Sequence, residues 1–354
     1  MKALAINSSA RAGQGSKTEV LLDCLVEGMR EAGAEVEVVN LRQKDVRYCL
    51  GCFTCWTKTP GKCVHPDDMT KELFPKYVES DLVILATPLY HYTVNAQLKT
   101  FIERTLPISQ PFFIERGGVT RHPLRRTPPP VVLLSVAGFP EASVFDQLSS
   151  YARYLFGERL VAEIYRPSSE MFRADTTNPR LLEVLNAARQ GGRELAETGR
   201  VSPETLGRIT GPITDFKTMA PIGNLVWQTC IDEGVTMMEF QKRGMVPRPN
   251  SLETFLAVMQ MGFNPARAEG ARAAVQFDFS GQVSGACHFT IADGALTPGL
   301  GPAASPDLTI AAPFEVWMDI LTRKANGQQM FLEKKYTASG DVGLLPRFAA
   351  MFGG

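Results

Sequence analysis

The fold of the first half of the chain is decided by residues 2–30, which read KALAINSSARAGQGSKTEVLLDCLVEGMR. Lys2–Asn7 is a short, nearly continuous apolar run, which is typical of a strand covered on both faces. Ser16–Arg30 places leucine, valine and methionine side chains on one face at helical spacing. The stretch therefore predicts a strand, a loop and a helix in that order.

The same alternation repeats through the first 165 residues. Four more apolar runs of strand length follow: Glu35–Leu41, Asp81–Ala86, Val131–Val136 and Leu160–Tyr165. A further helix is expected at Val94–Arg104. Repeats of this kind predict an α/β fold with a doubly wound, five-stranded parallel sheet. Ligands bind such sheets beyond the carboxyl ends of the strands, so the loops there are the candidate site.

Length and charge narrow the class of protein. The 354 residues suggest about two domains of roughly 150 residues each. The 37 Lys+Arg balance the 37 Asp+Glu, which argues against binding to nucleic acid or to anionic membranes. No apolar run approaches the roughly 18 residues of a membrane span, and the N-terminal run is too short for a signal peptide. We therefore expect a cytoplasmic protein with no membrane span.

The loop Asn7–Thr18 reads NSSARAGQGSKT and joins the first strand to the first helix. Ser16 and Glu19, three residues apart, predict a capping box at the start of the helix. The free N–H groups and the positive dipole of a helix start attract phosphate. The loop has neither a contiguous Gly-Lys-Thr nor the G-x-G-x-x-G fingerprint. This combination predicts the phosphate site of a mononucleotide such as FMN.

Two more loops follow neighbouring strands. Residues 86–95 read ATPLYHYTVN, and residues 135–139 read SVAGF. Aromatic rings with hydroxyl and amide groups can wall a planar ring and bond its edge. Gly138 lets the backbone approach a ligand closely. These loops are therefore candidates for holding the ring of the cofactor.

The most specific signal is the spacing Cys49-x2-Cys52-x2-Cys55-x7-Cys63. Thiolates two residues apart can converge on one centre, and a fourth completes the ligation. A [4Fe–4S] cluster and a tetrahedral zinc ion both fit this donor set, and free thiols that pack the loop are the third alternative. Three other cysteines are interpreted as small buried hydrophobic residues: Cys24, Cys230 and Cys287.

The pattern changes in the last third of the chain. Asn178–Gly199 reads as a long amphipathic helix, and Gly and Pro accumulate at Arg243–Ser251, which predicts a domain boundary. Beyond it, paired strands and then helices predict a small α+β domain. We expect domains at 1–245, with a core at 1–165 and a helical extension, and at 250–354.

With these motifs in view, residues 1–165 resemble the flavodoxin-like NAD(P)H-dependent FMN reductase family, which includes the iron–sulfur flavoproteins. The resemblance implies FMN as cofactor and NAD(P)H as co-substrate. It assigns the FMN phosphate to Ser9, Arg11, Ser16, Lys17 and Thr18. It assigns the ring to Thr87, Pro88, Leu89, Tyr90, His91, Asn95, Ala137, Gly138 and Phe139. The family often has Gly-Ser-Pro-Arg where this chain has Ser-Ser-Ala-Arg at 8–11.

The cysteine spacing resembles the iron–sulfur flavoprotein motif, and Asp67-Asp68-Met69 resembles the Asp-Asp-Met that follows it in that family. By resemblance, four thiolates would hold a [4Fe–4S] cluster: Cys49, Cys52, Cys55 and Cys63. Family members usually pair around the flavin, so a homodimer or homotetramer is expected.

Residues 255–354 resemble a sterol carrier protein type two domain. The matching points are Pro-Asp-Leu-Thr-Ile at 306–310, Trp317 on a helix, and Tyr336-x-Ala-x-Gly-Asp before the last helix. The resemblance implies a tunnel for a lipid or another apolar ligand. The helix Pro313–Ala325 and the terminal helix, with Phe348 and Phe352, would line it.

These features predict an FMN-dependent NAD(P)H oxidoreductase that passes electrons to an unknown acceptor, either directly or through a Cys-ligated [4Fe–4S] cluster, with a C-terminal domain that binds an apolar ligand. No side-chain nucleophile is predicted, because the cofactor carries the chemistry. Two alternatives stay open: a flavin electron-transfer protein without its own NAD(P)H site, and a lipid-binding protein with a regulatory flavin domain.

Overall fold

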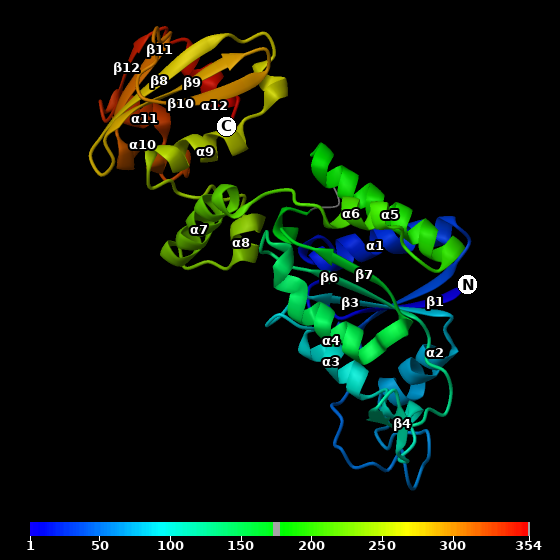
Figure 1. Cartoon of the computed structure of the whole chain (residues 1–354). Coiled ribbons are helices and arrows are strands. Elements are labelled where there is room, and N and C mark those ends of the chain that lie inside the picture. Colours follow the sequence, from blue (N-terminus) through cyan, green and yellow to red (C-terminus); the bar gives the residue numbers. More distant parts are fainter. Residues whose placement is uncertain (173–177, 353–354) are drawn as a thin grey trace. The chain divides into compact units, whose positions relative to one another are not determined.

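The computed structural model describes residues 1–172 and 178–352, and the chain forms two compact units, Met1–Phe216 and Lys217–Gly354 (Figure 1). Each unit has its own hydrophobic core. The predicted boundary at Arg243–Ser251 lies inside the second unit, between α8 (Met237–Lys242) and α9 (Leu252–Gly262).

The first unit is built on a five-stranded parallel sheet with the order β2-β1-β3-β6-β7. Its strands are β1 (Lys2–Asn7), β2 (Glu35–Asn40), β3 (Leu82–Pro88), β6 (Val131–Val136) and β7 (Leu160–Arg166). All five coincide with the predicted runs to within two residues. This strand order is that of the flavodoxin-like fold, so the predicted fold class is confirmed.

Helices cover both faces of this sheet, and the continuous apolar strands explain why (Figure 1). One face carries α1 (Lys17–Glu31), α5 (Pro179–Thr198) and α6 (Pro203–Thr210). The other carries α2 (Phe74–Glu79), α3 (Ala96–Glu103) and α4 (Asp146–Phe156). The predicted helices at 16–30, 94–104 and 178–199 are therefore present.

The contact between α1 and α5 is unusually close. Gly28 of α1 lies against the backbone carbonyl of Arg189, and Gly192 of α5 lies against the backbone carbonyl of Leu25. A Cβ atom at either glycine would collide with backbone, which cannot move aside as a flexible side chain can. The two helices therefore touch backbone to backbone.

A small hairpin was not predicted. β4 (Ile114–Arg116) and β5 (Val119–Arg121) pair antiparallel through Gly117 and Gly118, whose φ angles are 62° and 72°. Arg125 N donates to the carbonyl of Ile108 at 2.8 Å, which ties the end of the segment to the 3-10 turn Leu106–Ile108 that follows α3.

The second unit contains a mixed five-stranded sheet with the order β10-β9-β8-β11-β12. Its strands are β8 (Ala273–Ser280), β9 (Gly285–Ala292), β10 (Ala295–Leu300), β11 (Leu308–Pro313) and β12 (Thr337–Gly340). Its helices are α7 (Phe216–Asp232), α8, α9, α10 (Phe314–Leu321), α11 (Gly327–Leu332) and α12 (Leu344–Ala350). The α+β class predicted for this part is confirmed.

One predicted helix in this unit is too long. α10 ends at Leu321 rather than reaching Ala325, because Arg323 has a φ of 63°, in the left-handed region that stops a helix. Trp317 lies on α10, as predicted, and its ring packs 5.1 Å from that of Phe277 in the core.

Within residues 1–172 and 178–352, none of the helices combines the length and the apolar character needed to cross a bilayer.

Candidate functional site

Three loops meet at the carboxyl edge of the parallel sheet. Parallel register aligns Asn7 of β1 with Ala86 of β3, and Thr87 of β3 with Ser135 of β6. Hydrogen bonds then tie the loops together. Ser8 Oγ donates to the carbonyl of Ala86 at 3.0 Å, and Leu89 N donates to that of Val136 at 2.9 Å. The loops that carry the predicted cofactor residues are therefore neighbours, at the point where the strand order reverses.

The loop after β1 ends in a cluster of buried hydroxyl groups. Ser16 is the N-cap of α1, and its Oγ accepts a hydrogen bond from Glu19 N at 3.1 Å. The same Oγ donates to Ser9 Oγ at 2.8 Å, and Ser9 Oγ also accepts from Arg11 N at 3.3 Å. Thr18 is buried in the first turn of α1. This arrangement sets hydroxyl groups beside the free N–H groups of a helix start, which suits a phosphate.

The capping box is only half formed. The carboxylate of Glu19 does not bond the N–H of Ser16, which donates instead to Gly13 O at 2.9 Å in a short 3-10 turn. Glu19 accepts from Gly13 N and from Asn7 Nδ2, both at 3.2 Å, and pairs with Arg42 at 2.9 Å. The prediction of a complete box is wrong because a competing cation and amide hold the carboxylate elsewhere.

One cation reaches the loop after β1 from another element, and one leaves it. Arg42, just beyond β2, donates through Nη1 to the carbonyls of Arg11 at 3.1 Å and Ser9 at 3.4 Å. Lys17 Nζ donates to the carbonyl of Phe172 at 2.7 Å, and so reaches the loop after β7. The Arg11 side chain is exposed. Arg42 was not predicted, although its place directly after a strand of the sheet was a signal.

The loop after β3 is anchored by Asn95, the N-cap of α3. Its Oδ1 accepts from Leu98 N at 3.1 Å, and its Nδ2 donates to the carbonyl of Ser8 at 2.7 Å. Its own N–H donates to Thr87 Oγ1 at 3.2 Å. One buried residue thus fixes the helix start and the loop after β1 through its side chain, and the end of β3 through its backbone N–H.

The tip of this loop is tightly turned and open. Pro88 and Leu89 continue from β3, and Tyr90 exchanges two backbone hydrogen bonds with Thr93, both at 3.1 Å. Between them His91 and Tyr92 have φ angles of 47° and 64°. The side chains of residues 90–92 are exposed, so aromatic groups stand at the surface beside the site.

The loop after β6 is tied to the loop after β7. Ala137 N donates to the carbonyl of Arg166 at 2.9 Å, and its own carbonyl accepts from Ser169 N at 2.8 Å. The carbonyl of Phe139 accepts from Ser168 N at 2.8 Å, while its ring is exposed. At Gly138 a Cβ would stand 3.4 Å from the Glu170 side chain, an ordinary contact within the protein.

Unpartnered polar atoms are found near these loop ends. Ser135 Oγ, on β6, and Ser168 Oγ, after β7, are buried and lack a hydrogen-bond partner in the described residues. Leaving such a group unpaired costs about 1–3 kcal/mol, so native proteins usually provide a partner. These hydroxyls, the hydroxyl cluster at Ser16 and the exposed aromatic groups together fit FMN. Ser168 was not predicted, because nothing local marks it.

Arg166 is a second buried residue that the sequence did not reveal. Its Nη1 donates to the carbonyls of Ile209 at 2.6 Å and Gly211 at 2.8 Å, at the end of α6. Burial lowers its pKa to about 10. A cation at a helix C-terminus is stabilising, and this contact holds α6 on the sheet.

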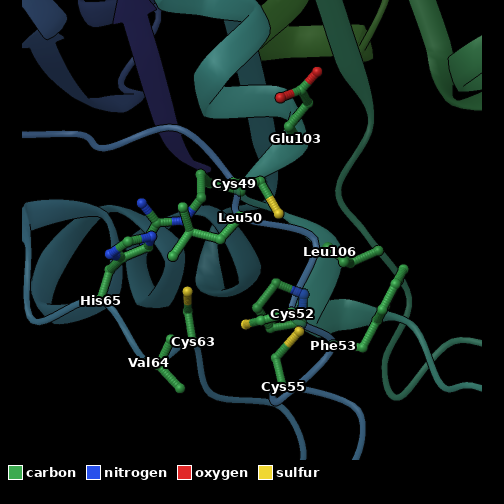
Figure 2. Close-up of a pocket in the computed structure, with 12 residues that line it drawn as sticks. Cys49, Leu50, Cys52, Phe53, Cys55, Cys63, Val64, His65, Glu103 and Leu106 are labelled. Atoms are coloured by element: carbon green, nitrogen blue, oxygen red, sulfur yellow. The ribbon is translucent and has the colours of Figure 1, made fainter.

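The four cysteines of the motif line one pocket, in the long connection between β2 and α2 (Figure 2). Cys55 is buried, Cys52 is exposed and the other two are intermediate. Gly51 N donates to Cys49 Sγ at 3.5 Å, and Thr54 Oγ1 donates to Cys52 Sγ at 3.4 Å. Among residues 1–172 and 178–352, no three His, Cys, Asp or Glu side chains converge closely enough to hold a single metal ion.

The electrostatics of the pocket suit a cationic centre. Burial raises the pKa of the Cys55 thiol, and the charges of the three neighbouring cysteines raise it further. The four groups therefore repel one another when ionised, and a bound positive centre relieves that repulsion. His65 Nε2 is buried in the same pocket without a partner among the described residues. The donor set thus fits a thiolate-ligated centre.

A buried ion pair holds the cysteine loop to the fold. Arg104, at the end of α3, donates to Asp67 at 2.6 Å and 3.0 Å, and both side chains are at most 1% exposed. Arg104 Nη1 also donates to the carbonyl of Arg47 at 2.6 Å. Burial alone would raise the pKa of Asp67, but hydrogen bonds from Arg104 and from the backbone N–H groups of Arg47 and Thr70, with the charge of Arg104, hold the pKa well below its usual range. The Asp-Asp-Met segment therefore anchors the loop.

Aromatic packing adds a second anchor. Trp56 Nε1 donates to Ser109 Oγ at 3.2 Å, and the Trp56 ring lies 4.9 Å from that of Phe53 and 4.7 Å from that of His122. The loop is thus joined to the segment that carries the β4–β5 hairpin.

The other cysteines differ from those of the motif. Cys230 and Cys287 are buried as predicted, whereas Cys24 is only partly buried. Burial raises the pKa of Cys24 to about 11 and that of Cys287 to about 12, so both remain protonated thiols.

The second unit has a cavity of about 250 Å³ between its sheet and α12. Val275, Ile291 and Phe348 line it, with Arg272 and Arg347. Of the two residues predicted to line a tunnel, Phe348 lines this cavity, and the ring of Phe352 packs 4.7 Å from that of Phe348.

The comparisons with known proteins agree with this geometry. Residues 1–148 match the family described as NADPH-dependent FMN reductase, and residues 257–353 match the SCP-2 sterol transfer family. These matches confirm both resemblances predicted from the sequence, one in the first part of the chain and one in the last.

Individual relatives match the first domain. An iron–sulfur flavoprotein of Archaeoglobus fulgidus is 47% identical over 108 residues, which are 30% of this chain and 46% of that protein. One of Methanocaldococcus jannaschii is 36% identical over 29% of this chain and 50% of its own length. An FMN-dependent NADH:quinone oxidoreductase of Bradyrhizobium diazoefficiens is 25% identical over 44% of this chain and 81% of its own. The chain spans about half the length of the iron–sulfur flavoproteins it matches.

Proposed function

We propose that this chain is an FMN-dependent NAD(P)H oxidoreductase, with a [4Fe–4S] cluster on its cysteine loop and an apolar ligand in its C-terminal unit. The observation that carries the proposal is that hydrogen bonds join three loops at one edge of the sheet. The most important of these bonds are made by Asn95, which lies in the loop after β3 and donates to the loop after β1. A hydroxyl-lined helix start and an aromatic loop are thereby held as neighbours, as a flavin mononucleotide requires.

Different residues would bind the phosphate and the ring of FMN. Ser9, Ser16 and Thr18, with the first N–H groups of α1, would bind the phosphate, and Arg11 and Arg42 would supply positive charge. Thr87, Asn95 and the backbone of Ala137–Phe139 would orient the ring, and Tyr90 would shield it from water. FMN, once bound, accepts a hydride from NAD(P)H and releases electrons singly.

A polynuclear cluster is the centre that we assign to the cysteine pocket, because all four thiols of the motif line it. The printed names of the relatives, iron–sulfur flavoproteins, support the same assignment. Cys49, Cys52, Cys55 and Cys63 would be the ligands.

The remaining assignments are also proposals. Exposed aromatic side chains at the flavin edge, Tyr90, Tyr92 and Phe139, support pairing of two subunits there. The seven free cysteines suit a reducing cytoplasm. The match to the sterol transfer family supports a lipid or another apolar molecule as ligand of the second unit.

The test of the flavin site is FMN affinity of the full-length chain after the double substitution Arg11→Ala and Ser16→Ala. Each lost hydrogen bond to a charged phosphate is worth about 1.5–3 kcal/mol, so affinity should fall about 100-fold or more. The matched control, Arg116→Ala with Ser202→Ala, removes an exposed arginine and the N-cap of α6 and should leave affinity unchanged. Wild-type affinity in the first variant would refute the assignment.

Anaerobic mixing with NADPH and with NADH tests the activity. Rapid bleaching of the flavin is expected with at least one nucleotide. If neither bleaches it while a reduced protein donor does, the chain is an electron carrier. The iron content and the visible spectrum of anaerobically purified protein test for the cluster. We expect about four iron atoms per chain.

A further inference from the structure

A second cavity adjoins the cysteine pocket in the first unit. Its volume is about 580 Å³, and it shares Cys63, Arg104 and Pro107 with the cysteine pocket. We call it the basic cavity, because Lys62, Arg125 and Arg126 line it. The family resemblance assigns no ligand to it, and the flavin loops do not contribute to it.

The walls of the basic cavity combine apolar and cationic groups. Met69, Phe74 and Ile108 belong to the hydrophobic cluster below this face of the sheet, and they present apolar surface to the cavity. The backbone positions of the cations are fixed by neighbouring segments. Arg125 N donates to the carbonyl of Ile108 at 2.8 Å, and Lys62 N donates to that of Thr59 at 2.9 Å.

The positive charge here is not neutralised within the fold. In the part of the chain that the structure describes, none of Lys62, Arg125 and Arg126 forms an ion pair with a carboxylate. By contrast, nearby Lys44 and Lys76 both pair with Glu72, at 2.6 Å and 2.8 Å. Arg104 is neutralised by Asp67.

Glu79 is the carboxylate among the lining residues, so the lining carries a net positive charge. Apolar surface beneath unpaired cations favours an organic anion with an apolar body. The apolar part gains from leaving water, and the anionic part gains from the arginine side chains.

We propose that the basic cavity binds an organic anion with an apolar, quinone-like body, which receives electrons beside Cys63. The electron supply rests on the proposed function. The balance is NAD(P)H + H⁺ + quinone → NAD(P)⁺ + hydroquinone, in which the nucleotide loses a hydride and the acceptor gains two electrons and two protons. Because Cys63 and Arg104 belong to both cavities, the acceptor lies next to a ligand of the proposed cluster.

Binding is tested first, without turnover. The probe is anthraquinone-2-sulfonate, titrated at equilibrium into the oxidised full-length chain, with 2-(hydroxymethyl)anthraquinone as the uncharged comparison. Arg125→Gln with Arg126→Gln should weaken binding of the sulfonate about tenfold and leave the uncharged compound unaffected. Added salt should weaken the binding of the sulfonate to the wild type more than its binding to this variant.

The matched control is Arg116→Gln with Arg121→Gln, which removes two exposed charges from the neighbouring hairpin without touching the cavity. It should bind the sulfonate as the wild type does. Absence of saturable binding, or an equal loss in the control variant, would overturn the site.

Turnover then separates this proposal from the proposed function. The flavin of the Arg125→Gln, Arg126→Gln variant should be bleached by NAD(P)H at the wild-type rate. The KM of this variant for the sulfonate should be about tenfold higher than that of the wild type. An unchanged KM would show that the acceptor binds elsewhere and would overturn the acceptor role alone. If NAD(P)H does not bleach the flavin of the wild type at all, the proposed function is refuted, whereas the result of the binding experiment remains valid.

Discussion

The loops that follow β1 and β2 leave the same edge of one sheet but are held in different ways. The loop after β1 is short, and its groups bond the backbone of neighbouring strands, as Ser8 bonds Ala86. The connection after β2 is long and mostly irregular, and a buried contact between Asp67 and Arg104, 37 residues apart, anchors it. Strand register therefore positions the proposed flavin site, whereas a few side chains position the cysteine loop.

The largest effect is expected from Asp67→Asn, which breaks the anchor of the cysteine loop. Removing one partner of a buried ion pair costs about 3–5 kcal/mol, because Arg104 is left charged and unpaired. The iron content should fall and hydrogen exchange across residues 45–68 should rise, while FMN stays bound. Glu183→Gln is the control, because its exposed pair with Arg208 is worth about 1 kcal/mol or less. Equal loss of FMN and iron would show that the loops after β1 and β2 are not held independently.

Asn95→Ala is the converse test on the flavin side. It leaves the carbonyl of Ser8 and the start of α3 without their partner, so the free energy of unfolding should fall by about 2 kcal/mol. FMN affinity should fall about tenfold with the iron content unchanged. Asn178→Ala removes the exposed N-cap of α5 and serves as control. It should lower stability by about 1 kcal/mol without changing FMN affinity.

Acid should loosen the cysteine loop selectively. The pKa of Asp67 is lower in the fold than its ordinary 3.8, so its pairing stabilises the protein above that pH. This stability is lost as the pH falls below 3.8 toward the lower pKa of the folded protein. In cluster-free protein, cleavage by pepsin within residues 45–68 should increase over that range. Asp67→Asn should lack this pH-dependent step, and a step of equal size in that variant would assign it to another group.

The smallest effect concerns one hydrogen bond to sulfur. The Thr54 hydroxyl lowers the pKa of the Cys52 thiol, so Thr54→Val should raise that pKa and reduce the thiolate fraction. Alkylation of Cys52 in cluster-free protein at pH 7.5 should slow about threefold. Thr57→Val, whose hydroxyl bonds a backbone carbonyl in the same loop, should not change the rate.

Local patterns predicted most of the fold. Five apolar runs gave the five parallel strands, and the helix start at Ser16 followed from its hydroxyl at the N-cap. These features depend on residues within one or two turns of each other, which sequence spacing reports directly. The β4–β5 hairpin was missed because strands of three residues carry no measurable alternation.

The parts that escaped prediction depend on contacts between distant segments. Arg104 matters because Asp67 lies beside it, and Ser168 because its loop returns to that of Phe139. Glu19 was assigned to a capping box, yet Arg42, from beyond the next strand, holds its carboxylate. The family resemblance gave candidate site residues but did not indicate which distant partners position them.

The glycine contact between α1 and α5 has a consequence for how this flavin domain can be moved or shortened. The family match ends at residue 148, and the predicted core ended at 165. α5, however, covers the apolar face of α1, the helix whose start we propose as the phosphate site. A chain cut at 165 would bare that face and would be expected to aggregate. A fragment that folds independently and keeps the proposed flavin site must therefore extend to about Phe216, where the first unit ends.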